Sequence, residues 1–526
     1  MPSGDATMGA MDADSPTPAS DPTSSLGDGK HPRDTPRSPA FRAFIARDWR
    51  PRPTALPDRL PSAPFAADRR RRVGAMFPGE RLVFPAGGLK PRSNDTDYRF
   101  RPHSAFSHLT GLGTDQEPDA VLVLEPIEPG AEGGDTHEAV LFFRPRAERD
   151  TTEFYSDARY GELWVGVRPS LEEITALTEI STRHLDEVLD ALAKDAGEDG
   201  VSVRVVRDAD AAITSHLDGA REAGHTASDE RREAVTGADA ELARVVSELR
   251  LVKDAYEIEQ MREAVAASAR SFEDVVRALP QAVATTRGER VIEGVFATRA
   301  RIEGNGTGYD TIAASGPHAC TLHWIRNDGP VREGDLVLID AGVELDSLYT
   351  ADVTRTLPVT GTFSEAQRRV YEVVLEAADA AFAVARPGTR FRDLNVAAQT
   401  VIARRLAEWG LLPGTAEESL DPEGQFHRRW IVHGVSHHLG IDVHDCAQAR
   451  QEMYMDGILE PGMVFTIEPG LYFNADDLMA PEELRGIGIR IEDDVLVTAD
   501  GCENLTAMLP RTVPEIEAWM AGLLGR

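Results

Sequence analysis

The sequence has few cysteines and no long apolar segment. Its 526 residues include only three cysteines, which are far apart: Cys320, Cys446 and Cys502. An odd, dispersed set favours a reduced protein over a disulfide framework, so we expect a cytoplasmic location. No apolar run reaches the roughly 18 residues that a membrane span needs. The first 40 residues also lack the charged and apolar segments of a secretory signal.

Basic residues are also in short supply. Lys and Arg number 56 against 88 Asp and Glu, which gives a net charge of −32. Nucleic acid and anionic membrane would be repelled by such a chain, so we expect neither as a partner. Hydrophobic residues make up 41% of the sequence, which is enough for two or three globular domains.

Composition divides the chain into three parts. Residues 1–40 are rich in Ser, Pro, Asp and Gly and are predicted to be a disordered extension. Residues 41–246 have the mixed pattern of an α/β domain. Residues 247–526 alternate strand and helix patterns and are predicted to form a second domain.

Local patterns predict the elements of the first domain. Apolar runs at 81–85, 120–124 and 139–143 indicate buried strands. The segment 218–241 is polar throughout and is interpreted as a solvated insertion near the end of the domain.

The second domain is predicted to be α+β. Capping-box spacings start helices after Asp254 and Ser364, and a further helix runs from about Asp393 to Trp409. Two β-rich runs, LVLID and SLYTADVTRTLPV, predict a hairpin. Three short apolar strands follow. We expect an antiparallel sheet with helices packed on one side.

Four carboxylates and one histidine in this domain have the residue types of a two-metal site: Asp340, Asp352, His437, Glu468 and Glu492. The hairpin carries one aspartate on each arm, and the three later strands carry the other candidates. Unpaired charges in apolar runs are costly, and inward carboxylates repel one another unless cations neutralise them. The pattern therefore predicts bound metal; the alternative is scattered surface acids that border strands.

Other hydrolytic motifs are incomplete. His433 and His437 have the spacing of a zinc-protease helix, but Gly434 stands where that motif needs Glu. Ser436 lacks the second glycine of a nucleophile elbow. No CxxC pair is present.

Six segments carry a specific resemblance: SGPHACTLHW, LVLIDAG, ADVTRTLPVTG, VHGVSHHLGIDVHD, LEPGMVFTIEPGLY and GIGIRIEDDVLVT. In this order, over residues 249–512, they resemble the pita-bread metallopeptidases and most of all aminopeptidase P. DYRFRPHSAFSHLTG and EPDAVLVL resemble, more weakly, that family's creatinase-like N-terminal domain. Asp340 and Asp352 are 12 positions apart, one more than in most relatives. We expect a β-bulge to absorb the difference.

The resemblance implies a role for each metal ligand. Asp352 and Glu492 would bridge two divalent cations, with Asp340 on one ion and His437 and Glu468 on the other. This oxygen-rich set favours Mn²⁺ over Zn²⁺. Glu468 would also be catalytic and carry the proton of the attacking water to the leaving proline nitrogen.

It also implies roles around the metals. His323 and His444 would be catalytic and substrate-binding, because they would polarise the scissile carbonyl and stabilise the oxyanion. His433 would line the proline subsite and Tyr472 would bond near the metals. Arg490 would orient carboxylates from behind. The alternatives are structural histidines, a core tyrosine and an ordinary ion pair.

The function implied is a dinuclear-metal aminopeptidase that releases the N-terminal residue of peptides with proline second. Family analogy suggests a homodimer or homotetramer. Prolidase, which takes Xaa-Pro dipeptides, is the nearest alternative, although the short Glu468-to-Glu492 segment favours aminopeptidase P. A catalytically silent pita-bread protein that only binds partners is the alternative of a different class. Methionine aminopeptidases lack the long N-terminal domain, and creatinase-like enzymes lack the metal ligands.

Overall fold

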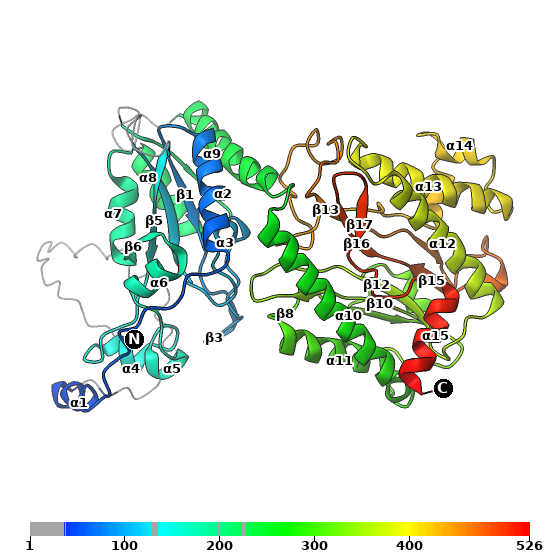
Figure 1. Ribbon diagram of the computed structural model, residues 1–526, viewed down its shortest axis with the longest axis horizontal. Coiled ribbons are helices and arrows are strands. Elements are labelled where there is room, and N and C mark those ends of the chain that lie inside the picture. The colour runs from blue at the N-terminus through cyan, green and yellow to red at the C-terminus, as the bar shows by residue number, and fades with distance from the viewer. Residues whose placement is uncertain (1–35, 37, 128–134, 197–199, 223–227, 526) are drawn as a thin grey trace, which may run out of the picture.

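The computed structural model describes residues 36, 38–127, 135–196, 200–222 and 228–525 (Figure 1). The predicted disordered extension lies almost entirely outside the described residues, although Pro39 and Ala40 begin helix α1 (Pro39–Ile45). The described chain forms an N-terminal and a C-terminal body, which lie side by side (Figure 1).

The N-terminal body is built on a five-stranded sheet in the order β6-β5-β4-β1-β7. The strand predictions at 81–85, 120–124 and 139–143 are confirmed. β1 pairs antiparallel with β4 and parallel with β7. The strands are β1 (Glu80–Pro85), β4 (Val121–Pro126), β5 (His137–Phe143), β6 (Ser181–His184) and β7 (Ser202–Val205), with a separate ribbon of β2 (Pro91–Ser93) and β3 (Thr96–Asp97).

Helices cover both faces of this sheet, because successive strand residues point to opposite sides and both sides are apolar. Leu82 and Phe84 pack with α2, α3 and α9, whereas Val83 packs with α7 and α8. The helices are α2 (Ala63–Met76), α3 (Ser104–Thr110), α4 (Thr152–Ser156), α5 (Glu162–Val165), α6 (Leu171–Thr178), α7 (Val188–Ala193), α8 (Ala211–Glu222) and α9 (Asp229–Leu249).

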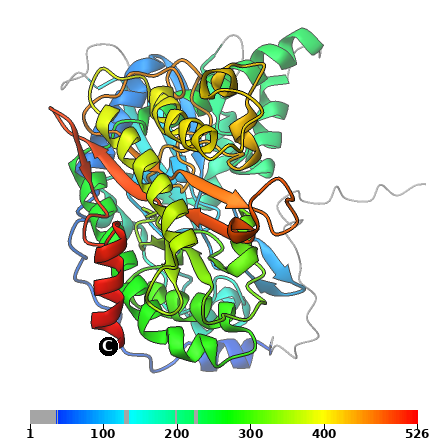
Figure 2. The same ribbon diagram turned by 90° about the vertical axis from the view of Figure 1, so that its right-hand side faces the viewer.

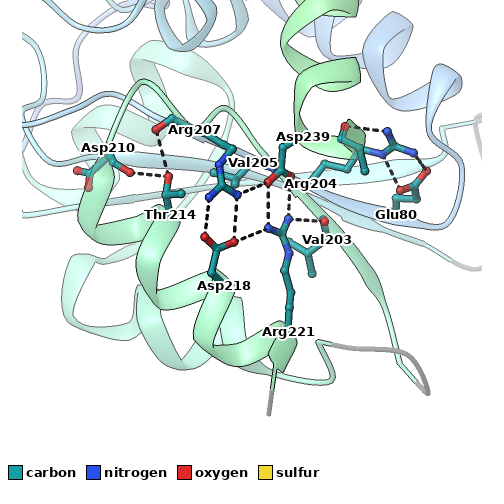
Figure 3. Close-up of polar contacts among 11 residues, drawn as sticks. Glu80, Val203, Arg204, Val205, Arg207, Asp210, Thr214, Asp218, Arg221 and Asp239 are labelled. Atoms are coloured by element: carbon teal, nitrogen blue, oxygen red, sulfur yellow. Dashed lines mark hydrogen bonds and ion pairs between the residues drawn. The ribbon is translucent and has the colours of Figure 1, made fainter. Parts of the chain in front are cut away.

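The described residues of the segment 218–241 are helical: they form the end of α8 and, after the N-cap Ser228, the start of α9. Most of residues 228–241 are exposed, which agrees with the predicted solvation, but Arg221 and Asp239 are buried. Asp239 of α9 lies 2.8 Å from both Arg207 and Arg221 and accepts the Val205 amide hydrogen at 2.9 Å (Figure 3). These bonds hold both helices against the edge strand β7.

Long helices frame the C-terminal body. The predicted capping boxes at Asp254 and Ser364 are present, and the helix predicted from Asp393 begins two residues earlier. Figure 2 shows α12, in yellow-green, crossing in front of the orange strands. The helices are α10 (Ala255–Val283), α11 (Gly288–Glu303), α12 (Glu365–Val384), α13 (Phe391–Glu408), α14 (Ala416–Leu420) and α15 (Val513–Leu524).

The strands of this body pair in separate antiparallel ladders instead of one continuous sheet: β12-β10-β9, β13-β16-β17, β14-β15 and β11-β8. Their bounds are β8 (Gly306–Thr307), β9 (Ile312–Ser315), β10 (Leu336–Asp340), β11 (Val343–Glu344), β12 (Thr354–Pro358), β13 (Val464–Ile467), β14 (Gly470–Phe473), β15 (Ile487–Arg490), β16 (Asp493–Val497) and β17 (Cys502–Asn504). The α+β class predicted for this domain is confirmed.

Polar and charged side chains join the two bodies. Arg69 of α2 lies 2.7 Å from Asp254, and His108 of α3 lies 3.3 Å from Glu257 of α10. Ser104 donates to Asp442 at 2.6 Å. The N-terminal body therefore contacts the segment after His437 directly.

Candidate metal centre

The β10–β12 hairpin places two candidate ligands on one face. Asp340 is opposite Thr354, and Glu344 is opposite Thr350. Four positions separate the two pairs on each arm, so the register is continuous and the predicted bulge is wrong. Asp352 precedes Thr354 by two residues and therefore points to the same side as Asp340.

The other candidates lie on or beside the ladders β13-β16-β17 and β14-β15. Glu468 follows β13, and Glu492 lies between β15 and β16. The expectation that a strand carries His437 is wrong. His437 lies in an irregular segment beside β13, where it exchanges hydrogen bonds with Thr466: its carbonyl accepts the Thr466 amide hydrogen at 2.9 Å and its amide donates to the Thr466 hydroxyl at 3.2 Å.

The structure brings all five candidates together. Ligand atoms of Asp352, His437 and Glu492 lie within 4.8 Å of one another. His437 Nε2 is 3.2 Å from Asp352 Oδ2 and 3.6 Å from Glu468 Oε1. Asp340 joins the group through Tyr309, whose hydroxyl lies 2.8 Å from Asp340 Oδ1 and also contacts Asp352 Oδ1.

The buried carboxylates of this cluster favour bound cations. Burial, reinforced by neighbouring carboxylates, raises the pKa of Glu492 well above its usual range and that of Glu468 to about 7. Burial likewise raises the pKa of Asp340. Burial opposes a charged His437, but Asp352 and Glu468 outweigh it and raise the pKa of this imidazole to about 9. A set of buried oxygens with one imidazole fits divalent cations that prefer oxygen ligands.

Arg490 lies behind the carboxylates. Its guanidinium contacts Asp340 Oδ2 directly. Its Nε donates to the Thr354 hydroxyl at 3.1 Å, and that hydroxyl donates to Glu492 Oε2 at 2.7 Å. One buried cation thus touches one candidate ligand directly and a second through a hydroxyl.

The same arginine orients Tyr472 and His433. Arg490 Nη1 donates to the Tyr472 oxygen at 3.0 Å, so the tyrosine hydrogen is free to bond His433 Nε2 at 2.8 Å. His433 Nδ1 then carries a hydrogen and donates it to the Gly434 carbonyl at 2.6 Å. Burial and Arg490 lower the pKa of His433 to about 4, so this ring is neutral near pH 7.

Two histidines lie at the margin of the cluster. The His444 ring meets the His437 ring edge-on, with 4.5 Å between centroids. His323 is exposed. Burial is the main cause that lowers the pKa of His433 and His444, and the nearby His323 adds to it in both. The adjacent His438 points elsewhere and stacks on Phe391 with 4.4 Å between ring centroids.

Comparisons with known proteins agree with this geometry. Residues 259–499 match the model of metallopeptidase family M24, and residues 66–202 match that of the aminopeptidase P N-terminal domain. Xaa-Pro aminopeptidase 1 of Streptomyces coelicolor is 52% identical over 475 residues, which cover 90% of each chain. The Escherichia coli Xaa-Pro aminopeptidase is 35% identical over 87% of this chain and 97% of its own. The chain belongs to the Xaa-Pro aminopeptidase family of M24 metallopeptidases.

Solved structures of the family share the fold. Pseudomonas aeruginosa aminopeptidase PepP is 32% identical, with a TM-score of 0.73 over 89% of this chain and 100% of that one. The predictions of the family, of the fold and of a metallopeptidase are confirmed. No helix in the described part of this family member is long and apolar enough to cross a membrane.

The family motifs did not reveal every residue that lines the cluster. Tyr309 contacts two candidate ligands but belongs to no recognised pattern. Thr354 could have been found, since it lies in ADVTRT beside Asp352. Asp494 is buried and its Oδ2 accepts the Asp352 amide hydrogen at 3.2 Å, which supports the backbone behind that ligand.

Proposed function

We propose that this enzyme binds two divalent cations and releases the N-terminal residue from peptides whose second residue is proline. The observation that carries the proposal is the convergence of three ligand atoms within 4.8 Å, beside two further buried carboxylates. Asp340, Asp352, His437, Glu468 and Glu492 are the residues that would hold the two cations. Mn²⁺ is preferred because four of the five ligands are carboxylates.

Bound cations would activate a water as nucleophile and polarise the scissile carbonyl. The residues of the chain do the remaining work. The leaving proline nitrogen belongs to a tertiary amide and must be protonated before it departs. Glu468 is suited to receive a proton from the water and to return it to this nitrogen, because its carboxylate lies inside the cluster, with Oε1 3.6 Å from His437 Nε2.

Three histidines surround the substrate in this proposal. His444, edge-on to His437, and His323 donate hydrogen bonds to the carbonyl oxygen, whose charge grows in the transition state. His433 borders the proline subsite. This placement is supported by the hydrogen bond that His433 accepts from Tyr472, whose hydroxyl is oriented by Arg490.

We also propose the larger organisation. A creatinase-like domain at 41–246 precedes a pita-bread catalytic domain at 247–526. The two family matches, at 66–202 and 259–499, fall inside these limits. Peptides are the partners, and family resemblance supports a cytoplasmic homodimer or homotetramer.

One assay tests the function. Chelator-treated protein should be inactive and should recover with Mn²⁺. Arg-Pro-Pro should then be cleaved and the matched peptide Arg-Ala-Ala hardly at all. Full activity in protein shown by elemental analysis to lack metal would overturn the proposal. Equal rates on the two peptides would indicate a general aminopeptidase, and cleavage of Xaa-Pro dipeptides alone would indicate prolidase.

A further inference from the structure

Glu289, in the first turn of α11, accepts four hydrogen bonds from one loop. Its Oε1 accepts the Ser315 amide hydrogen at 2.9 Å and lies 2.7 Å from His318 Nδ1. Its Oε2 accepts from Trp324 Nε1 at 2.9 Å and from the Gly329 amide at 2.6 Å. The side chain is 0% exposed. A carboxylate suits this position because each of its oxygens accepts two bonds and donates none.

The same loop carries His323. Cys320, Leu322 and Trp324 pack inward against an apolar cluster that includes Tyr472, whereas His323 and Ile325 are exposed. This alternation means that the direction of His323 depends on how its neighbour Trp324 is held. Trp324 is held by Glu289 and by His318, whose ring stacks on the indole with 3.8 Å between centroids.

The loop is packed closely around the carboxylate. A Cβ at Gly329 would come within 2.5 Å of the His318 ring and 2.7 Å of Glu289 Oε2, so a glycine is required there. Asn327, which is fully buried, fastens the loop to β9: its Oδ1 accepts the Ala313 amide hydrogen at 3.0 Å and its Nδ2 donates to the Thr311 carbonyl at 2.8 Å. These contacts fix the backbone of the loop at Asn327 and Gly329.

We propose that Glu289 is a positioning residue for catalysis, which fixes the 315–329 loop so that His323 is directed at the scissile carbonyl. The inference rests on the proposed role of His323. Its support is that the inner face of the loop packs on Tyr472, the residue that bonds His433, so the loop and the proline subsite share one wall.

Glu289→Gln tests the proposal with almost no change in volume. The new amide NH₂ would face at least one N–H donor that cannot become an acceptor, since only His318 can present a bare ring nitrogen, so at least one of the four bonds is lost. With a Xaa-Pro-Pro substrate, kcat should fall about 10- to 100-fold, as small misplacements of catalytic groups do. KM should change less than about twofold and metal content should stay normal, because no candidate ligand is altered.

A double-mutant cycle separates positioning from general damage. If Glu289 acts through His323, then Glu289→Gln should change kcat less than about twofold in a His323→Ala background. Asp239→Asn is the matched control. Asp239 is also a fully buried carboxylate that accepts from a backbone amide and two side chains, but it lies in the N-terminal body (Figure 3). This variant should lower Tm yet keep kcat.

Trp324→Phe is a second variant that tests the same inference if Glu289→Gln does not fold. It removes one donor to Glu289 and retains an aromatic ring beside His318. Here kcat should fall several-fold in the wild-type background and stay unchanged when His323 is already Ala. Independent, multiplying effects of the two substitutions would overturn the inference, as would a normal kcat in Glu289→Gln.

Different results would overturn the proposed function and the inference about Glu289. A Mn²⁺-loaded wild type that cleaves no Xaa-Pro peptide would overturn the proposed function itself. A normal kcat in His323→Ala would remove the assigned role of His323 and, with it, the inference about Glu289. The inference alone would be overturned by a third result: the wild type is active, His323→Ala is impaired, and the effects of Glu289→Gln and His323→Ala on kcat multiply in the double variant.

Discussion

Lys253 places its ammonium nitrogen 3.2 Å from Asp445 Oδ2, and the two side chains are 0% and 1% exposed. Arg250 lies 2.8 Å from the other carboxylate oxygen. Lys253 directly precedes Asp254, the N-cap of α10, and the Asp445 amide donates to the His438 carbonyl at 2.9 Å. The junction between the two bodies is therefore tied to the segment that carries His437 and His444.

We expect Asp445→Asn to destabilise the protein strongly. The substitution leaves two buried cations without their carboxylate, which costs about 3–5 kcal/mol when one partner of a buried pair is removed. Denaturant unfolding of the metal-free protein measures the loss. Arg59→Gln is the control, because Arg59 and Glu179 form an exposed pair 3.1 Å apart that should contribute little. Equal stability of the two variants would contradict the prediction.

Asp352→Asn and His444→Ala should separate a metal ligand from a catalytic neighbour. Asp352→Asn should lower metal occupancy and abolish turnover, since two cations would share one fewer anion. His444→Ala should retain its metals and lose about 100-fold in kcat, because its proposed bond acts in the transition state. Metal stoichiometry and turnover are measured on both. The assignment is wrong if His444→Ala loses its metals while Asp352→Asn keeps them.

Tyr309→Phe should weaken metal binding. Its hydroxyl touches the carboxylates of Asp340 and Asp352, so its loss frees both to move. Removal of such an orienting group costs about 10- to 100-fold in metal affinity. Titration of the metal-free variant with Mn²⁺ gives the value. Tyr349→Phe is the matched control, because this buried tyrosine bonds Glu257 at the domain junction and should leave metal affinity unchanged.

Mn²⁺ binding should release protons and weaken as the pH falls below about 7. In the metal-free protein, burial raises the pKa of Glu468 from its ordinary 4.5 to about 7, so a cation must displace a proton there. This carboxyl favours the folded metal-free state below about pH 4.5, and that contribution is lost as the pH rises through about 7.

Calorimetry at pH 6 in two buffers of different ionisation enthalpy counts the protons released. Glu468→Gln is the control, because it has no proton to lose at this position. The same proton count in wild type and variant would show that Glu468 is already ionised before the cation binds.

Local pattern was sufficient for several parts of this protein. The strands at 81–85, 120–124 and 139–143 and the helix that follows Asp254 depend mainly on neighbours a few residues away, so their sequences predict them. Asp340 and Asp352 could be paired from sequence because a short hairpin joins them. Where pattern and packing compete, packing decides. Most of residues 229–241 are exposed, as their polar sequence suggests, yet Asp239 among them is buried between two arginines.

The sequence by itself determined the family, the α+β class and the five candidate ligands, because these depend on residue types in a fixed order. Tertiary structure alone decided the continuous register of the hairpin, the contact of Tyr309 with two carboxylates and the four bonds of Glu289 to the loop of His323. The physical reason is distance along the chain: Glu289 and Gly329 are 40 residues apart, and no local periodicity records a hydrogen bond between them.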